Sequence, residues 1–184
     1  MAFKSTILII PGLGNSGPQH WQTYWEQTYG FTRVQQQDWD TSDCNDWIKT
    51  LNQAVSAYDP ANLILVGHSL ACCTIAYWAQ KFGTKIKGAL LVSPSDTEAK
   101  SYPAGTTGFT PMPLNKLPFP TITVASTNDF YVTPSRAKQF AHAWGSTLIT
   151  IGDAGHINAG SGHSQWIEGL AYLQDLDDPA KAQV

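Results

Sequence analysis

The chain alternates short apolar runs with longer segments in which apolar residues recur at helical spacing. Most of the short runs are continuously apolar and rich in β-branched residues, which is typical of strands covered on both faces of a parallel sheet. Strands are predicted at Thr6–Ile10, Thr32–Gln36, Leu63–Val66, Ile86–Val92, Thr121–Ala125 and Thr147–Ile151.

The segments between these strands carry apolar residues three and four positions apart, which predicts helices. Thr133 and Pro134 supply a favourable N-cap and first turn for one of them. The predicted helices are Gln19–Tyr29, Asp43–Ala57, Leu70–Phe82, Ser135–Trp144 and Ser164–Leu173. Because strands and helices alternate, we expect an α/β fold of three layers, with a doubly wound parallel sheet between two layers of helices.

Residues 94–120 depart from this alternation because they hold six of the eleven prolines. Proline disfavours the interior of helices and central strands, so the segment is predicted to be irregular. Two interpretations remain open: a surface loop held down by its own apolar residues, or a wall of a pocket that could also move as a lid. No linker-like composition divides the chain. Residues 1–176 are therefore predicted to form one domain, and the polar residues 177–184 a flexible tail.

Composition and charge narrow the range of partners. The 184 residues carry a formal net charge of -3 and no cluster of Lys and Arg, which argues against nucleic-acid binding. No apolar run approaches the ~20 residues of a membrane span, and no signal peptide is evident. Cys44, Cys72 and Cys73 lack metal-ligand spacing and are expected to be buried thiols. We therefore expect a cytoplasmic protein with a small-molecule substrate and no membrane partner, and leave homodimer formation open.

The sharpest chemical signal is the stretch "LILVGHSLACC", in which Ser69 lies between a predicted strand and a predicted helix. This is the context of the nucleophile elbow G-x-S-x-G, with Ala71 in place of the last glycine. Positions two before and two after the serine must be small because the turn is tight. The alternative is a plain strand–helix turn with an N-capping serine. His68, inside the turn, is predicted to point away from Ser69 and to be structural.

A serine nucleophile needs a base that is oriented by an acid, in the chain order Ser, Asp, His for this turn. Asp129 follows the fifth predicted strand and His156 follows the sixth. Both loops lie at the same edge of a parallel sheet as Ser69, so the three side chains can converge. Two other acids remain possible: Asp153, three residues before His156, and Asp96, after the fourth strand.

The glycine-rich loop after the first strand, "GLGNSG", matches the dinucleotide-binding pattern G-x-G-x-x-G. That reading also requires an acidic residue at the end of the second strand, to hold a ribose. The region reads "TRVQQQDWD", where Asp38 comes several residues too late. We therefore expect the loop to present an oxyanion-hole donor instead. Leu13 N–H is the first candidate and Gly14 N–H the second, and Leu70 N–H is the partner donor.

The substrate pocket is predicted to combine the loop after the first strand with residues that follow later strands. Its candidate residues are Asn15, His20, Trp39, Phe130 and Tyr131. His163 is expected at the pocket rim or at the cap of the last helix. The chemistry of a serine nucleophile needs neither a metal nor an organic cofactor, so none is expected.

With these residues assembled, the chain resembles the α/β-hydrolase superfamily, and within it the small serine hydrolases of the retinoblastoma-binding-protein-nine and YdeN type. The resemblance rests on "IIPGLGNSGPQHWQTYWE", "QDWDTSDCNDWIKTLNQAV", "LVGHSLACCTIAYWA" and "GHINAGSGHSQWIEGL". It implies a minimal α/β-hydrolase fold without a large lid, with a six-stranded parallel sheet in the order 2-1-3-4-5-6. It also implies Ser69 as nucleophile, Asp129 as acid and His156 as base.

The expected activity is hydrolysis of a small ester or amide through an acyl-enzyme. Two alternatives are kept: a non-catalytic protein-binding module on a hydrolase fold, and an acyltransferase. A fold of this type does not by itself decide the substrate.

Overall fold

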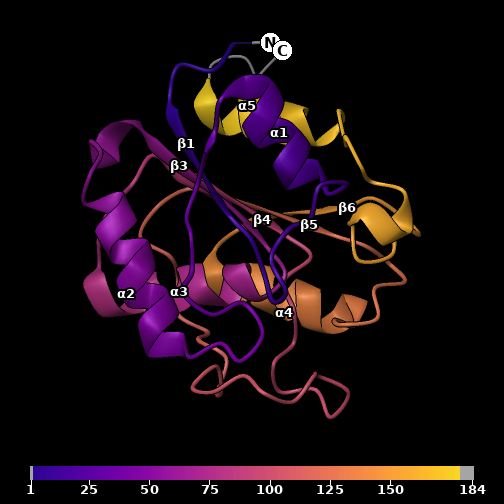
Figure 1. The fold of residues 1–184 in the computed structure, drawn as a ribbon. Helices are drawn as coiled ribbons and strands as arrows, with labels where there is room; N and C mark the ends of the chain where they lie inside the picture. Colours follow the sequence, from indigo (N-terminus) through magenta and orange to yellow (C-terminus); the bar gives the residue numbers. More distant parts are fainter. Residues whose placement is uncertain (1, 179–184) are drawn as a thin grey trace.

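The computed structural model describes residues 2–178, which form a six-stranded, all-parallel sheet between layers of helices (Figure 1). The strand order is β2-β1-β3-β4-β5-β6, so the predicted order is confirmed. The strands are β1 Thr6–Ile10, β2 Thr32–Arg33, β3 Leu63–His68, β4 Gly88–Val92, β5 Thr121–Ala125 and β6 Thr147–Thr150.

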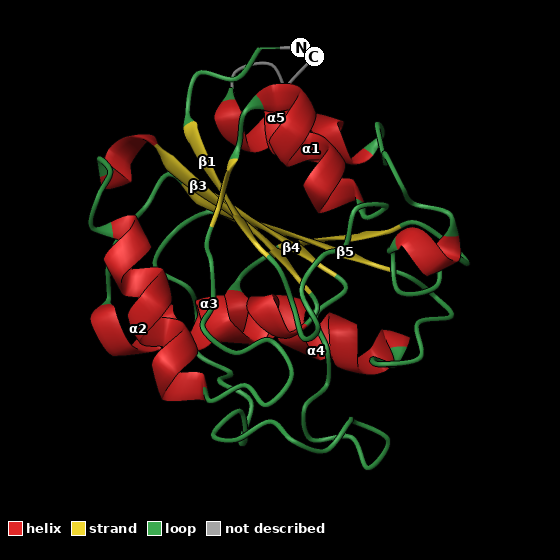
Figure 2. Cartoon of the chain, viewed as in Figure 1, coloured by secondary structure: helices red, strands yellow, loops and turns green. Residues whose placement is uncertain are grey.

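Helices cover both faces of the sheet, as the alternating sequence pattern predicts. In Figure 2, α1 and α5 lie over one face, and α2, α3 and α4 lie over the other. The helices are α1 Trp21–Tyr29, α2 Cys44–Val55, α3 Leu70–Phe82, α4 Pro134–Trp144 and α5 Gly169–Asp177, with short 3-10 turns at Pro60–Asn62 and Ala159–Ser161.

The two faces of β1 show why continuously apolar strands are needed. Ile7 and Ile9 pack into one buried cluster with the tryptophans of α1 and the leucines of α5. Leu8 and Ile10 pack into a second cluster with α2, α3 and α4. Because successive side chains point to opposite faces, every position of a central strand must be apolar.

Most predicted boundaries agree with the structure to within one or two residues, but β2 is much shorter than expected. It was predicted to extend to Gln36, yet it ends at Arg33. Val34 N–H still donates to Ile9 O of β1 at 2.9 Å, and the chain then leaves the sheet. Gln36 turns inward instead, with its amide nitrogen 3.4 Å from Trp47 O. As an edge strand, β2 has only one neighbour to hold it in the sheet.

The last helix begins at Gly169 rather than at the predicted Ser164. Trp166 has a φ of 42°, outside the helical range, and its ring stacks on Trp25 with centroids 5.7 Å apart. Gln165 O accepts a hydrogen bond from Trp25 Nε1 at 2.9 Å. The chain must turn here to bury Trp166 against α1, so the helix starts only after that turn.

The helix α5 ends in a buried carboxylate. Asp177 accepts hydrogen bonds from the backbone N–H groups of Lys4 and Ser5, at 2.8 and 2.9 Å. Lys87 Nζ lies 3.2 Å from the same carboxylate. Asp177 is thus the last residue of α5, whereas the sequence predicts that the flexible tail begins at this residue. The remainder of that tail beyond Asp178 lies outside the described residues.

The proline-rich segment 94–120 is fastened to the domain at several points. Trp144 Nε1 donates to Pro113 O at 2.8 Å, and Leu117 N–H donates to Trp144 O at 3.0 Å. Its apolar residues Phe109 and Met112 are buried. The segment therefore packs against the α3 and α4 side of the sheet. Within residues 2–178, no helix is both long and apolar enough to cross a membrane.

Candidate active site

The turn from β3 to α3 holds Ser69 in a conformation that a non-glycine residue rarely adopts. Its φ is 59° and its ψ is -123°, and its N–H donates to Val92 O at 2.9 Å. A Cβ on Gly67 would lie 2.7 Å from Ile75 Cδ1, which explains the glycine there. Ser69 makes no side-chain capping hydrogen bond to α3, so the N-cap alternative is not supported. Strain of this kind is characteristic of functional positions.

His156 and Asp129 form a largely buried pair beside this turn. His156 Nδ1 lies 2.9 Å from both carboxylate oxygens of Asp129. Asp129 also accepts a hydrogen bond from Tyr131 N–H at 2.9 Å, and its side chain is fully buried. Because the carboxylate can only accept, Nδ1 carries a proton, and in the neutral form of the ring Nε2 keeps a lone pair. That is the state required of a general base.

The hydroxyl of Ser69 is engaged by a residue that the sequence did not single out. Ser69 Oγ lies 2.7 Å from Ser95 Oγ, and either hydroxyl can be the donor. No hydrogen bond between Ser69 and His156 is present in the described part of the chain. Catalytic hydrogen bonds are often long or misaligned without substrate, so this geometry is compatible with a base that engages the serine on binding.

The rival acids have other partners. Arg136 binds Asp96 through two hydrogen bonds of 2.9 Å. Asp153 accepts a hydrogen bond from Thr127. Of the three candidate acids, Asp129 is therefore the one that contacts His156. His163, expected at the rim or at a cap, lies 3.2 Å from Ser161 Oγ, beside the 3-10 turn.

The glycine-rich loop after β1 passes directly against the serine turn. A Cβ on Gly12 would lie 2.8 Å from His68 O and 2.8 Å from the Cβ of Ser69. Gly14 N–H donates to Trp39 O at 2.8 Å, so the second oxyanion candidate is already occupied. Leu70 is the first residue of α3, where N–H groups lack a helical acceptor.

Arg33 stands at the end of β2, where a dinucleotide site would require an acid. Its guanidinium instead holds the glycine-rich loop, donating to Asn15 Oδ1 at 2.6 Å and to Ser16 O at 3.0 Å. It also forms an ion pair with Glu26 at 2.7 Å. Arg33 thus helps to hold the glycine-rich loop in place. Because a basic residue stands where a ribose would need an acid, the dinucleotide interpretation has no support.

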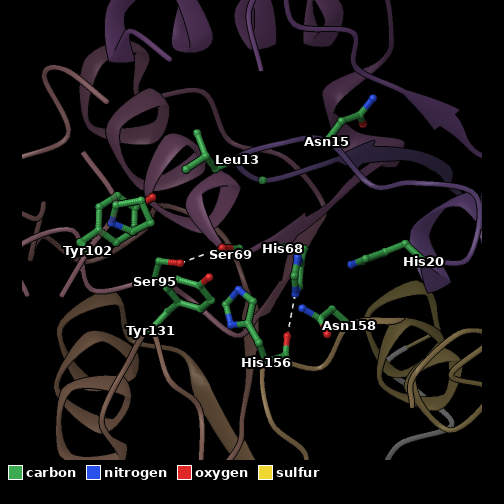
Figure 3. Close-up of a pocket in the computed structure, with 12 residues that line it drawn as sticks. Leu13, Asn15, His20, His68, Ser69, Ser95, Tyr102, Tyr131, His156 and Asn158 are labelled. Carbon is green, nitrogen blue, oxygen red and sulfur yellow. Dashed lines mark hydrogen bonds between the residues drawn. The ribbon is translucent and has the colours of Figure 1, made fainter. Parts of the chain in front are cut away.

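A pocket opens where these elements meet (Figure 3). Of the predicted residues, the structure brings Leu13, Asn15, His20 and Tyr131 to its wall, together with Ser69 and His156. The other lining residues are Gly12, His68, Ser95, Tyr102, Pro103 and Asn158. Tyr102 and Pro103 belong to the proline-rich segment, so its predicted role as a pocket wall has structural support.

Two predicted pocket residues do not line it. The ring of Trp39 packs edge-on against Trp47 with centroids 5.7 Å apart, and only its backbone carbonyl holds the loop at Gly14. The side chain of Phe130 is 74% exposed. In both cases a loop conformation turns the side chain away from the pocket, and no local sequence signal marks that direction.

His68 has a role that the sequence only partly indicated. Its Nε2 lies 2.9 Å from His156 O, and because a carbonyl accepts, this nitrogen carries the hydrogen. Burial holds the pKa of His68 well below its usual range, so the ring is neutral. His68 supports the backbone of His156, as a structural residue would, and it also lines the pocket.

The three cysteines are buried and unpaired. Burial raises the pKa of Cys44 to about 12 and that of Cys72 well above its usual range. A buried thiol of this kind is a poor nucleophile. Among the described residues, no group of three or more His, Cys, Asp or Glu side chains is arranged to hold a metal ion.

Comparisons with known proteins agree with this geometry. A family model described as serine hydrolase matches residues 7–175. A YdeN-like hydrolase from Pectobacterium atrosepticum superposes with a TM-score of 0.82 at 31% identity, covering 94% of this chain and 90% of that one. The ydeN gene product of B. subtilis superposes with a TM-score of 0.73 at 18% identity, covering 94% and 98%.

A more distant structure, the N-formylmaleamic acid deformylase of Pseudomonas putida S16, has a TM-score of 0.70 at 14% identity, with 92% of each chain covered. At such identities the likeness to the B. subtilis protein and to the deformylase concerns the fold alone. A search of curated proteins returned no match to this chain.

Proposed function

Because the chain belongs to the serine hydrolase family and is a hydrolytic enzyme, we propose that it cleaves a small ester or amide through an acyl-enzyme on Ser69. The observation that carries the proposal is the contact of His156 Nδ1 with the Asp129 carboxylate at 2.9 Å, because His156 lines the same pocket as Ser69, whose backbone is strained. Strain and a positioned base occur together where a hydroxyl must become a nucleophile.

In the first half of the reaction, Ser69 Oγ attacks the carbonyl carbon of the substrate and His156 Nε2 takes its proton. Asp129 keeps the imidazole in the required tautomer and stabilises the imidazolium. For this step Ser69 Oγ exchanges its contact with Ser95 for one with His156. When the tetrahedral intermediate collapses, His156 returns the proton to the leaving group, and the acyl group stays on Ser69.

In the second half, water attacks the acyl-enzyme with His156 again acting as base, and Ser69 is regenerated. The negative charge on the carbonyl oxygen is held in both halves by the N–H groups of Leu13 and Leu70. The tight packing of Gly12 against the Ser69 turn supports this assignment because it brings the two backbone segments together.

The pocket wall supports a small, uncharged acyl substrate. Leu13, Tyr102, Pro103 and Tyr131 supply apolar and aromatic surface, and none of the lining residues is Lys, Arg, Asp or Glu. A charged acyl group would be buried without a partner, which is costly.

A fluorophosphonate probe tests the nucleophile directly, because it labels an activated serine. We expect the wild type to be labelled on Ser69 by peptide mapping, and Ser69→Ala and His156→Ala to lose the label. Ser95 provides the internal comparison, since its hydroxyl lies 2.7 Å from that of Ser69. Label on Ser95, or label retained by Ser69→Ala, would show that the nucleophile is assigned wrongly.

A further inference from the structure

His20 presents a hydrogen-bond donor whose identity the local structure determines. It is the N-cap of α1, and its Nδ1 accepts a hydrogen bond from Gln22 N–H at 3.1 Å. The ring is only 8% exposed, and burial, followed by the charges of His156 and Arg33, lowers its pKa to about 3. The ring is therefore neutral, and because Nδ1 accepts, the hydrogen lies on Nε2.

This Nε2–H has no hydrogen-bond partner within the described residues, although it is buried. His20 lines the same pocket as Ser69, and Figure 3 shows its ring pointing towards His68 and Asn158. The ring of His68 is 4.8 Å away, edge-on. Buried donors are almost always satisfied in proteins, so an orphan donor at a pocket wall indicates a group that arrives with a ligand.

Asn158 supplies a second donor at the same wall. Its Oδ1 accepts a hydrogen bond from Ser161 N–H at 3.1 Å, which identifies the other end of the amide as the NH₂ group. No acceptor for that NH₂ group is present in the part of the chain that the structure describes. In Figure 3 the amide nitrogen of Asn158 lies on the side that faces His68. Asn158 also follows His156 on the same loop, two residues later.

The chemistry of these two groups selects their ligand. Both are neutral donors, so they bind an acceptor. No Lys or Arg lines the pocket, and the nearby Arg33 is paired with Glu26. A carboxylate would be desolvated there without a countercharge, whereas a neutral carbonyl oxygen costs less to bury and accepts both hydrogen bonds.

The position of the two groups selects the part of the substrate. His156 must reach the leaving group in order to protonate it. In Figure 3, His20 and Asn158 lie on one side of His156, while Ser95 and Tyr102 lie on the other. The two donors lie on the side that carries the loop of His156, and the inference places the leaving group on that side, within reach of His156.

We propose that His20 Nε2–H and the side-chain NH₂ of Asn158 form a subsite that binds a neutral carbonyl oxygen on the leaving group of the substrate. The inference rests on the proposed function, and it narrows the substrate class to acyl compounds whose leaving group carries an amide or ester carbonyl.

The test uses two butyrate esters whose alcohols have equal length. One alcohol carries a tertiary amide carbonyl, and the other has a methylene group in its place. Butyrate release is followed by pH-stat, and the ratio of the two kcat/KM values is compared between the wild type and His20→Asn. Asparagine keeps an N-cap acceptor for Gln22 N–H but removes the Nε2 donor. His142→Asn, at an exposed position of α4, is the matched control.

We expect the ratio to fall about tenfold in His20→Asn, the effect of leaving one buried acceptor unpaired, and to stay at the wild-type value in His142→Asn. Comparing ratios removes the intrinsic difference in leaving-group reactivity. An unchanged ratio in His20→Asn overturns the proposal. The proposal is also overturned if the ratio falls only for a second pair of esters, in which the carbonyl lies in the acyl chain.

A binding measurement separates this inference from the proposed function. Both esters are titrated into Ser69→Ala and into the double variant Ser69→Ala, His20→Asn, and binding is followed by NMR. The ratio of the two Kd values then replaces the ratio of kcat/KM values, and no turnover is needed. If neither ester is hydrolysed but the Kd ratio falls, the subsite stands and the proposed reaction fails. If hydrolysis proceeds but neither ratio changes, the reaction stands and the subsite is absent. A thermal unfolding midpoint close to that of the wild type verifies that each variant is folded.

Discussion

At the scale of single residues, the backbone of Gly12 lies against the nucleophile turn so closely that no side chain fits between them. The nearest atoms belong to His68 and Ser69, and Leu70 N lies 3.2 Å from the position of a Cβ. Any side chain there must separate the loop that presents Leu13 from the turn that presents Leu70. The two proposed oxyanion donors, Leu13 N–H and Leu70 N–H, are useful only while both aim at one point.

Gly12→Ala is therefore expected to lower kcat/KM by about 10²-fold, the usual cost of losing one oxyanion donor or displacing it by about 1 Å. Gly17→Ala, in the same loop, is the control because nothing lies within 4 Å of its Cβ position. Steady-state kinetics on a p-nitrophenyl ester compares the two. Equal activity in both variants would mean that the close approach is not needed for catalysis.

The contact between Asp129 and His156 leads to a second prediction at this scale. Asp129→Asn preserves the shape of the acid but favours the wrong imidazole tautomer, so kcat is expected to fall about 10³–10⁴-fold. The control is Asp153→Asn, for which we expect a kcat near that of the wild type. Asp153 is an exposed carboxylate on the loop that bears His156, and its hydrogen-bond partner is Thr127. A comparable loss in both variants would argue that the loop, and not the acid, is what matters.

At the scale of elements, α1 holds the loop that bears His156. Trp21 Nε1 donates to Ile157 O at 2.8 Å, next to His156. Trp25 Nε1 donates to Gln165 O, and the Trp25 ring stacks on Trp166 with an interplanar angle of 4°. These tryptophans therefore fasten one layer of the molecule to the segment between β6 and α5.

Removal of the Trp166 ring leaves a cavity between α1 and α5. Trp166 is only 6% exposed, so Trp166→Ala is expected to lower the free energy of unfolding by about 3–5 kcal/mol, measured by urea denaturation. Phe130→Ala removes an aromatic ring that is 74% exposed, and it should leave the unfolding midpoint nearly unchanged. A loss below about 1 kcal/mol for Trp166→Ala would contradict the fastening role of the stacked pair.

At the scale of the whole molecule, Asp177 ties the end of α5 to the start of β1 and to the segment before β4. The partners of its carboxylate are Lys4, Ser5 and Lys87. Burial opposes the charged form, but the hydrogen bonds and Lys87 outweigh it, and the pKa of Asp177 is lowered. Stabilisation from a lowered pKa is complete above the unfolded pKa and is lost as pH falls through the folded pKa.

Asp177→Asn is accordingly expected to lose about 2 kcal/mol of stability at pH 7, the usual worth of hydrogen bonds to a buried charge. The gap to the wild type should begin to narrow below about pH 4, where the unfolded wild-type chain takes up the proton first, and should keep narrowing until the pH passes the lowered pKa of the folded carboxylate. Asp175→Asn, on the exposed side of the same helix, is the control. Thermal unfolding between pH 3 and 7 measures both, and a gap independent of pH would refute the role of the charge.

The sequence by itself determined the fold class, gave the strand order through resemblance, and singled out Ser69, Asp129 and His156 as the candidate triad. These follow from local signals: continuously apolar strands, a strand–turn–helix around a serine, and loops that must emerge at one edge of a parallel sheet. Such signals can be read from the sequence because strand and helix periodicity and turn geometry depend on residues that are close together in the chain.

Only the tertiary structure decided where side chains point and which residues meet. Trp39 and Phe130 turn away from the pocket, whereas Ser95 and Asn158 enter it. The helix α5 starts at Gly169, later than predicted, because Trp166 packs against Trp25 of α1. Each of these outcomes depends on packing between segments that are distant in the chain. The free energy of such contacts is set by burial in the assembled core, which no local pattern records.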